Sequence, residues 1–249
     1  MPKPYDYEEN IQAQQQAEEI YTKEIKPYKF LFLNGRSRWH RIELINQLND
    51  VLDSSLWTNL DSRGMGMTKT LPPEYEVPRY SDTSNPVTKE TYVKFDLFKN
   101  EWGEIYLYPK PYIDTYFSLV SETVFRMPYS FRTEKIWKPI VMGHPWICAA
   151  GRGYYRDMHN LGFQTYGHLI DESFDLIDNN QDRLNRIVKV VKDLCNRDDL
   201  VAFLKECYNV SKYNQQHHRE MAVQVRKEFP SRFQQFLNER SRIPPRSLG

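Results

Sequence analysis

Four charged residues in the middle of the chain have the types and spacing of a site for a phosphorylated ligand. Glu122 follows an apolar run, and Arg132, Glu134 and Lys135 open a helical pattern shortly afterwards. The first backbone N–H groups of a helix and its dipole favour anions. Arginine binds phosphate through a two-pronged fork and lysine as a point charge, while a nearby carboxylate can accept the hydroxyls of a ribose. Together these side chains predict a nucleotide diphosphate site.

Helix capping is the simpler interpretation of the Thr-Glu-Lys tripeptide taken alone. Thr133 would cap the helix, Glu134 would favour its positive end and Lys135 would be solvated. The surrounding pattern must therefore decide between a cap and a binding site.

Alternating strand and helix patterns are expected to position these residues. An open sheet built in this way binds ligands at the carboxyl ends of its strands. The alternation predicts an α/β fold with a doubly wound, mostly parallel, Rossmann-like sheet and helical extensions at both ends. The expected strands are 29–33, 116–120, 145–149 and 164–166, and the expected helices are 39–52, 133–142, 153–160 and 180–195.

Three other segments differ in character from this alternation. Residues 1–27 are expected to form a helical arm that Pro27 ends, and 61–90 a long loop rich in Gly and Pro, with short strands possible at 91–98 and 104–108. Residues 198–208 read as an amphipathic helix. Residues 211–249 read as a basic, polar, helical tail broken near Pro230, leaving 28–210 as the α/β domain.

Charge and cysteine content restrict the class of protein. The formal net charge is only +1, so no overall basic field collects nucleic acid. The tail from 211 to 249 carries eight Lys or Arg and three Asp or Glu, 8 − 3 = +5, which leaves −4 for the rest. Three cysteines suit a reducing compartment, and no apolar run has the roughly 18 residues of a membrane helix. We expect a cytoplasmic protein or a virion component, without a membrane partner.

The motifs around this segment resemble two groups of proteins. The runs that begin at Leu119, Phe131 and Gly143 are similar to the nucleotide-binding half of α1,3-fucosyltransferase-like glycosyltransferases. The chain also looks like the small glycosyltransferase-like proteins of large tailed phages, and this closer resemblance covers about residues 28–195. The motifs are Leu119-Val-Ser-Glu-Thr, Phe131-Arg-Thr-Glu-Lys-Ile-Trp-Lys-Pro-Ile, Gly143-His-Pro-Trp-Ile, Gly162-Phe-Gln-Thr-Tyr and Asp171-Glu-Ser-Phe-Asp.

The resemblance implies one half of a GT-B glycosyltransferase and assigns roles within it. Glu134 would bind the ribose of a nucleotide-diphosphate sugar, and Lys135 would hold the diphosphate with Arg132 nearby. An arginine of the first helix, Arg38 or Arg41, would also hold the diphosphate, and Arg36 remains open. Glu122 would lie against the donor sugar as the catalytic carboxylate, and donor binding would need no metal.

Two departures from the family pattern accompany these roles. Phe131 stands where the family has tyrosine, and Ser-Glu-Thr at 121–123 replaces Phe-Glu-Asn. The family also places an acceptor domain before the nucleotide domain, and residues 1–27 are too few to form one.

Two functional hypotheses follow. The first is an enzyme that transfers a sugar from a nucleotide sugar to modified DNA, a glycan or a protein. The second is a non-catalytic structural or assembly component, such as a phage virion protein, that keeps the fold and contacts its neighbours through residues 1–27 and 211–249.

Other polar clusters favour ordinary structural roles. Asp171, Glu172 and Asp175 are expected to be acidic residues at a helix entry, and His144 a turn residue bonded to backbone. His217 and His218 are expected to be solvated on a polar helix. The glycines at 151 and 153 lack the lysine of a phosphate-binding loop.

Overall fold

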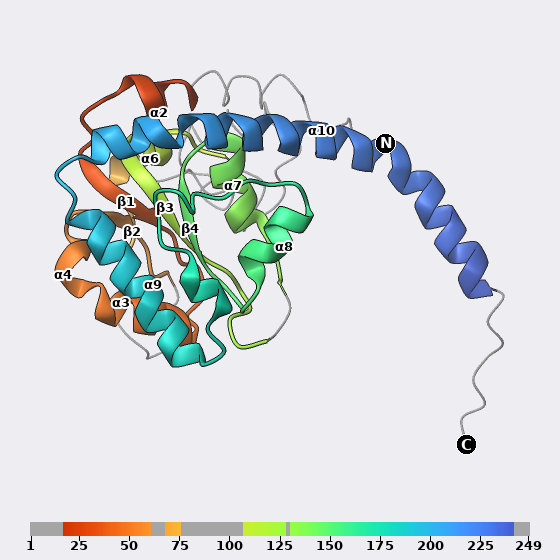
Figure 1. Cartoon of the computed structure of the whole chain (residues 1–249), viewed down its shortest axis with the longest axis horizontal. Coiled ribbons are helices and arrows are strands. Elements are labelled where there is room, and N and C mark those ends of the chain that lie inside the picture. The colour runs from red at the N-terminus through yellow and green to blue at the C-terminus, as the bar shows by residue number, and fades with distance from the viewer. Residues whose placement is uncertain (1–16, 61–67, 76–106, 128–129, 242–249) are drawn as a thin grey trace, which may run out of the picture.

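A computed structural model describes residues 17–60, 68–75, 107–127 and 130–241 (Figure 1). Most of the expected long loop and the possible strands at 91–98 lie outside these residues, as does the beginning of the expected helical arm. Of 104–108, only 107 and 108 are described, and they are not in a strand.

Within the described residues, four parallel strands form the centre of the domain. They are β1 (Tyr28–Phe32), β2 (Leu56–Trp57), β3 (Thr115–Ser121) and β4 (Trp146–Ala149), in the spatial order β2-β1-β3-β4. All seven residues of β3 are buried, as expected for a central parallel strand covered on both faces. The chain moves outward from β1 to β2 and then outward on the other side from β3 to β4. The predicted doubly wound, Rossmann-like α/β fold is confirmed.

Helices flank this sheet and follow the strands in the expected alternation. The helix α3 (Trp39–Gln47) packs on α9 (Asn180–Cys195), and α7 (Glu134–Met142) packs on α10 (Leu200–Ser241). Shorter elements are α2 (Glu19–Thr22), α4 (Asn49–Leu52), η1 (Pro73–Tyr75), α6 (Lys110–Ile113), α8 (Tyr154–Asn160) and η2 (Ser173–Leu176).

Aromatic side chains connect the sheet to α10. Phe30 of β1 stacks on Phe117 of β3 with ring centroids 5.5 Å apart, and Phe203 of α10 meets Phe117 edge-on at 6.5 Å. All three rings have no exposed surface. The core thus combines residues of the first strand and the last helix, which are far apart in sequence. Helix α10 is therefore an integral part of the domain.

Helix α7 has the sequence signals that begin and end a helix. Its N-cap Thr133 accepts a hydrogen bond from the backbone N–H of Lys135, as an N-cap threonine should. Gly143 ends the helix with φ +64°, a left-handed conformation that glycine adopts without strain. The Cβ of any other residue there would lie 2.6 Å from the side chain of Gln215 on α10.

Two predicted elements differ from the structure, and one strand was not predicted. The expected helix at 39–52 is divided at Leu48, whose ψ of 6° interrupts it between α3 and α4. The expected strand at 164–166 is wrong, because side chains occupy its backbone groups. Asn214 bonds both the N–H and the C=O of Gln164, and Glu172 accepts from the N–H of Tyr166. The short strand β2 was not predicted at all.

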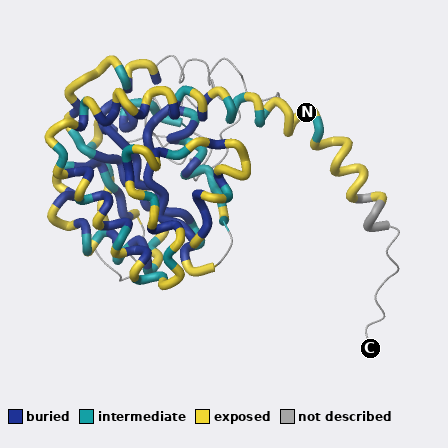
Figure 2. The backbone as a smooth tube through the Cα atoms, viewed as in Figure 1, coloured by how far each residue is buried: buried dark blue, intermediate teal, exposed yellow. Residues whose placement is uncertain are grey.

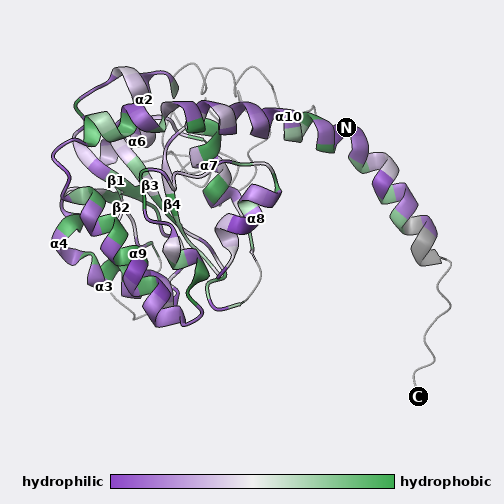
Figure 3. Ribbon diagram, viewed as in Figure 1, coloured by the Kyte–Doolittle hydropathy of each residue, from purple (hydrophilic) through white to green (hydrophobic). Residues whose placement is uncertain are grey.

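The polar end of the chain is also more continuous than predicted. The break at Pro230 is wrong, since α10 is one helix of 42 residues that includes this proline. Its first part lies across the domain, and Ser211 and Asn214 are each only 1% exposed. Its last part projects away from the domain (Figure 1), where most residues are coloured as exposed in Figure 2 and hydrophilic and hydrophobic residues alternate along the ribbon in Figure 3.

Candidate functional site at the carboxyl ends of β1 and β3

The predicted site residues gather where β1 and β3 end. Strand order reverses between these two neighbouring strands, and open α/β sheets bind ligands at such a point. The loop at 34–38 follows β1, Glu122 follows β3, and α7 begins close to both. Arg41 bonds Ser121, the neighbour of Glu122, and Glu122 bonds Thr133, the neighbour of Glu134, so these three charged groups lie near one another.

Arg41 faces inward and binds the end of β3. Its Nε donates to Ser121 Oγ at 3.2 Å, one Nη donates to Ser121 O at 3.0 Å, and the other donates to Arg36 O at 2.7 Å. The side chain is buried. Burial, together with the nearby positive charge of Arg38, lowers the pKa of Arg41 to about 10, so the residue stays cationic at neutral pH. Arg41 therefore connects α3 and the loop after β1 to the neighbouring strand.

Glu122 is buried as well, and its carboxylate fixes the start of α7. It accepts hydrogen bonds from the Thr133 N–H at 3.0 Å, the Thr133 hydroxyl at 2.7 Å and the Thr123 N–H at 3.3 Å. Glu122 as a whole has no exposed surface. Because the carboxylate satisfies these donors, it acts in this structure as a positioning group for the cap of α7.

Two further side chains, His40 and Arg183, hold the segment between β3 and α7. The sequence patterns did not predict this role for either of them. His40 Nε2 donates to Glu122 O at 2.9 Å, and its ring stacks on Phe125. Arg183 of α9 donates to Phe125 O at 2.7 Å and lies over the same ring. Burial lowers the pKa of His40 to about 4. The one sequence signal was the position of His40 beside Arg41 in the first helix.

The remaining predicted residues lie at the surface of this edge. Lys135 Nζ forms an ion pair with Glu134 Oε1 at 2.8 Å and also donates to Thr133 Oγ1. Burial acts to raise the pKa of Glu134, but the hydrogen bond and charge of Lys135 outweigh it and leave the pKa below its usual value. Arg132 donates to Ser130 Oγ at 2.6 Å, and Arg38 is exposed at the start of α3.

An uncompensated buried amide lies at the same edge. Asn34 follows β1 and is 1% exposed, yet its side-chain nitrogen and oxygen have no hydrogen-bond partner within the part of the chain that the structure describes. Its backbone is fixed, because its N–H donates to Thr58 Oγ1 and its C=O accepts from Leu60. Buried amides normally have partners, so Asn34 leaves unused hydrogen-bonding capacity beside the reversal point.

The acidic cluster after β4 is fully used by the fold. Asp175 accepts from the N–H groups of Tyr155 and Arg156 at the start of α8, and Asp171 pairs with Arg186. Glu172 accepts from Tyr166 N–H. Among the described residues no group of three or more His, Cys, Asp or Glu side chains could hold a metal ion.

The three other candidate histidines have structural contacts. His144 donates from Nε2 to Thr115 O at 2.8 Å, which confirms the prediction of a backbone-bonded turn residue. The expectation that His217 and His218 are solvated is wrong. His217 donates to Leu161 O and packs on Phe163, while the ring of His218 lies 5.5 Å from that of Trp137.

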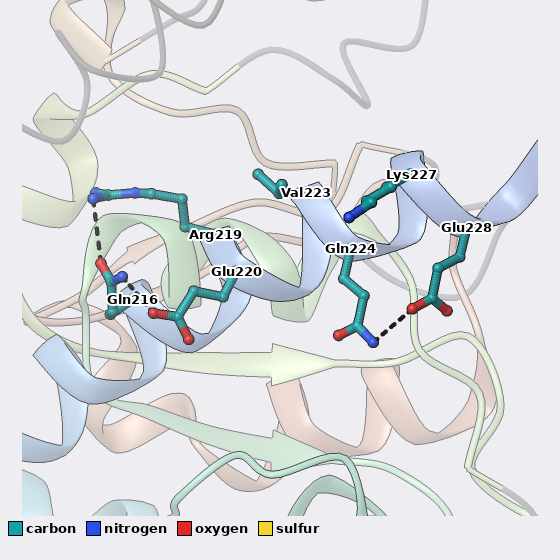
Figure 4. Close-up of a pocket in the computed structure, with 7 residues that line it drawn as sticks. All are labelled: Gln216, Arg219, Glu220, Val223, Gln224, Lys227 and Glu228. Atoms are coloured by element: carbon teal, nitrogen blue, oxygen red, sulfur yellow. Dashed lines mark hydrogen bonds between the residues drawn. The ribbon is translucent and has the colours of Figure 1, made fainter.

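A hollow elsewhere on the molecule has a different character. It has a volume of about 510 Å³, and the described residues that line it all belong to α10 (Figure 4). Binding sites usually collect groups from several elements around a concave surface, so this hollow beside one helix is a poor candidate for a small-molecule site. Its lining residues are Gln216, Arg219, Glu220, Val223, Gln224, Lys227 and Glu228.

Comparisons with protein-family models, curated proteins and solved structures gave no match. Within the described residues, no helix is long and apolar enough to cross a membrane.

Proposed function

We propose that this domain binds a nucleotide-diphosphate sugar at the carboxyl ends of β1 and β3 and transfers the sugar to an acceptor. The proposal rests chiefly on one observation: beside the strand-order reversal and the start of α7, Arg38 is exposed and Arg132, Glu134 and Lys135 are half-buried. The motif resemblance assigns the same residues to a nucleotide sugar.

The buried residues refine the roles that the resemblance implies. In this proposal Lys135 and Arg38 would hold the diphosphate, since Arg41 already donates to Ser121 and Arg36. Glu134 would accept the ribose hydroxyls after releasing Lys135 to the phosphates. Glu122 would act through Thr133, by orienting the first turn of α7, and would not touch the donor sugar unless its hydrogen bonds change.

Catalysis at such a site would come from orientation and from stabilising the leaving group. Holding donor and acceptor together converts an encounter into a step within one complex. Fixed cations and helix N–H groups would stabilise the diphosphate as its bond to the sugar breaks. Modified DNA, a glycan and a protein remain the candidate acceptors.

A ligand panel tests donor binding directly. UDP, GDP, CMP and ADP, each with common sugar conjugates, would be measured by thermal shift and calorimetry on the wild type, Lys135→Ala and Glu134→Ala. A ligand at about 100 times its dissociation constant stabilises a fold by roughly 2.7 kcal/mol. We expect one nucleotide to stabilise the wild type and to lose this effect in both variants.

The control is Lys189→Ala, which removes a lysine that pairs with Asp193 on the surface of α9. This variant should keep the full shift. No shift of the wild type with any nucleotide, or an equal loss in Lys189→Ala, would contradict the proposal.

A second candidate function, a structural or assembly role, is favoured by the end of α10. Phe229, Phe233 and Phe236 are 59%, 48% and 48% exposed there, which is unusual for large apolar side chains of a helix in water. The structure sharpens the truncations that test this role. Ala17 and Ile20 are buried, and Met221 packs against the core, so deletions should cover 1–16 and 222–249. Failure of both deletions to impair assembly with a partner would remove the support for this role.

A further inference from the structure

The apolar stripe of α10 continues past the edge of the domain. With 3.6 residues per turn, Val225, Phe229 and Phe233 fall within about 80° of one another around the helix. The residues that α10 buries against the domain, such as Phe203 and Cys207, fall in roughly the same sector. One face of the helix therefore changes from a buried surface to an exposed surface along its length.

This exposed part has the properties of an interface. Val225 is 54% exposed and the rings of Phe229 and Phe233 stack on each other at 5.6 Å. The same part contains Pro230, and a proline inside a helix costs about 3 kcal/mol. Helices in proteins gain most of their stability from packing an apolar face. We therefore expect the exposed apolar face of this helix to pack against another surface.

We propose that the exposed stripe of α10, centred on Phe229 and Phe233, pairs in antiparallel fashion with the same stripe of a second copy of this chain. Two-fold symmetric contacts of one patch with itself are the commonest way in which chains associate. Such a pair would set Phe229 of one copy against Phe233 of the other.

Charge complementarity supports an antiparallel pair with a second copy. Glu228 and Arg232 lie on one flank of the stripe and already form an ion pair at 3.0 Å within the helix. An antiparallel pair centred near residue 231 brings Glu228 of each copy beside Arg232 of the other. It separates the two copies of Arg226 by roughly 15 Å at 1.5 Å per residue.

The size of the stripe predicts a reversible dimer. An aromatic side chain buries about 200 Å², so three half-exposed rings offer roughly 300 Å² per copy and about 600 Å² per pair. This lies below the roughly 1,200 Å² at which standard interfaces begin. The association should therefore depend on protein concentration.

The test is sedimentation equilibrium of the full chain over a range of concentrations. The wild type should be a monomer at low concentration and a dimer at high concentration. The double substitution Phe229→Glu and Phe233→Glu should weaken association by at least about tenfold, a change of 1.4 kcal/mol. Helix content by circular dichroism keeps a folding defect distinct from a lost contact.

Two controls make the test specific. Val223 is 53% exposed on the same helix but outside the stripe, so Val223→Glu should dimerise like the wild type. Arg232→Glu should weaken the dimer, and Arg232→Glu combined with Glu228→Arg should restore it. The proposal is overturned by a wild type that stays monomeric, by a dimer that survives the double phenylalanine change, or by monomers that bind vesicles of anionic lipid through this stripe.

Discussion

The carboxylate of Glu122 and the residue Thr133 are joined by two hydrogen bonds, one from the Thr133 N–H at 3.0 Å and one from its hydroxyl at 2.7 Å. The end of β3 and the start of α7 are thereby fixed to each other across the intervening loop. A ligand bound at the first turn of α7 would meet backbone groups that are already oriented, which lowers the entropy cost of binding.

Replacing Glu122 by glutamine should destabilise the domain. Glutamine places an NH₂ group against N–H and O–H donors, and a buried donor left without a partner costs about 1–3 kcal/mol. Urea unfolding would measure this loss as a lower midpoint at unchanged slope. Glu43→Gln changes a partly exposed carboxylate that bonds Gln47 and should shift the midpoint much less. Equal midpoints for Glu122→Gln and the wild type would show that the carboxylate is not an anchor.

Substitutions of Arg41 and Arg38 should have different effects, although both residues are candidate phosphate ligands. Loss of Arg41 should lower stability, and loss of Arg38 should weaken nucleotide binding. Arg41→Met removes the bonds to Ser121 and Arg36 and should lower the free energy of unfolding by about 2–3 kcal/mol. Arg38→Ala should leave stability within about 0.5 kcal/mol, because Arg38 is exposed, but should weaken nucleotide binding. Calorimetry and urea unfolding on both variants would check this. A stable Arg41→Met that loses only binding would reverse the two assignments.

His144 should make the fold sensitive to acid. Its Nε2 donates to Thr115 O, so Nδ1 accepts from Ser118 Oγ at 2.9 Å, and the ring is neutral. Burial lowers the pKa of His144 to about 3, with a hydrogen bond to Thr115 opposing and the charge of Lys26 adding to this shift. The unfolded chain binds a proton near pH 6.5, so stability from His144 is present above that pH and is lost as pH falls towards 3.

The measurement is urea unfolding between pH 7.5 and pH 5 on His144→Gln. The variant should lose less stability over this range than the wild type, whatever its absolute stability. His168→Gln, at an exposed position, should keep the wild-type dependence. Parallel curves for His144→Gln and the wild type would contradict the prediction.

Glu172 should act in the opposite direction. Burial raises its pKa to about 7, although Thr165 and the Tyr166 N–H donate to it, and the charges of Asp175 and Asp171 raise it further. The folded state therefore holds a proton that the unfolded chain has released, and this contribution to stability is lost as pH rises from about 4.5 to about 7. Glu172→Gln should lose less stability than the wild type between pH 5 and pH 8. An unchanged loss would show that the carboxyl group is already ionised at pH 5.

The sequence predicted the fold where the hydrophobic period was clear. The strand at 116–120 is predicted from an apolar run and the start of the helix at 133–142 from the N-cap threonine, and both are local signals. The strand β2 has only two residues, which are too few to show a pattern. The predicted strand at 164–166 does not form because the backbone of Gln164 bonds the side chain of Asn214, from a helix far away in sequence. Such contacts between distant residues leave no mark in a short window of sequence.

The candidate site residues lie together at one edge of the sheet, but the directions of their side chains could not be predicted. Glu122 and Arg41 point inward because Thr133 and Ser121 offer partners there, and a motif does not record which partners a side chain finds. The role of His40 depends on the position of Phe125 and on the loop that Arg183 holds, so it appears only once the chain is folded.

The contacts of α10 with the beginning of the domain determine when this chain can fold during synthesis. Lys205 pairs with Glu24, Lys212 pairs with Glu18, and the rings of Tyr208 and Tyr21 meet edge-on. The central strand β1 likewise cannot pair with β3 until β3 has been synthesised, more than 80 residues later. Contacts so distant in sequence slow folding. A nascent chain that ends before Phe203 would leave Phe117 without the α10 ring that packs on it, so a ribosome-bound chain should resist protease only after the first part of α10 has emerged.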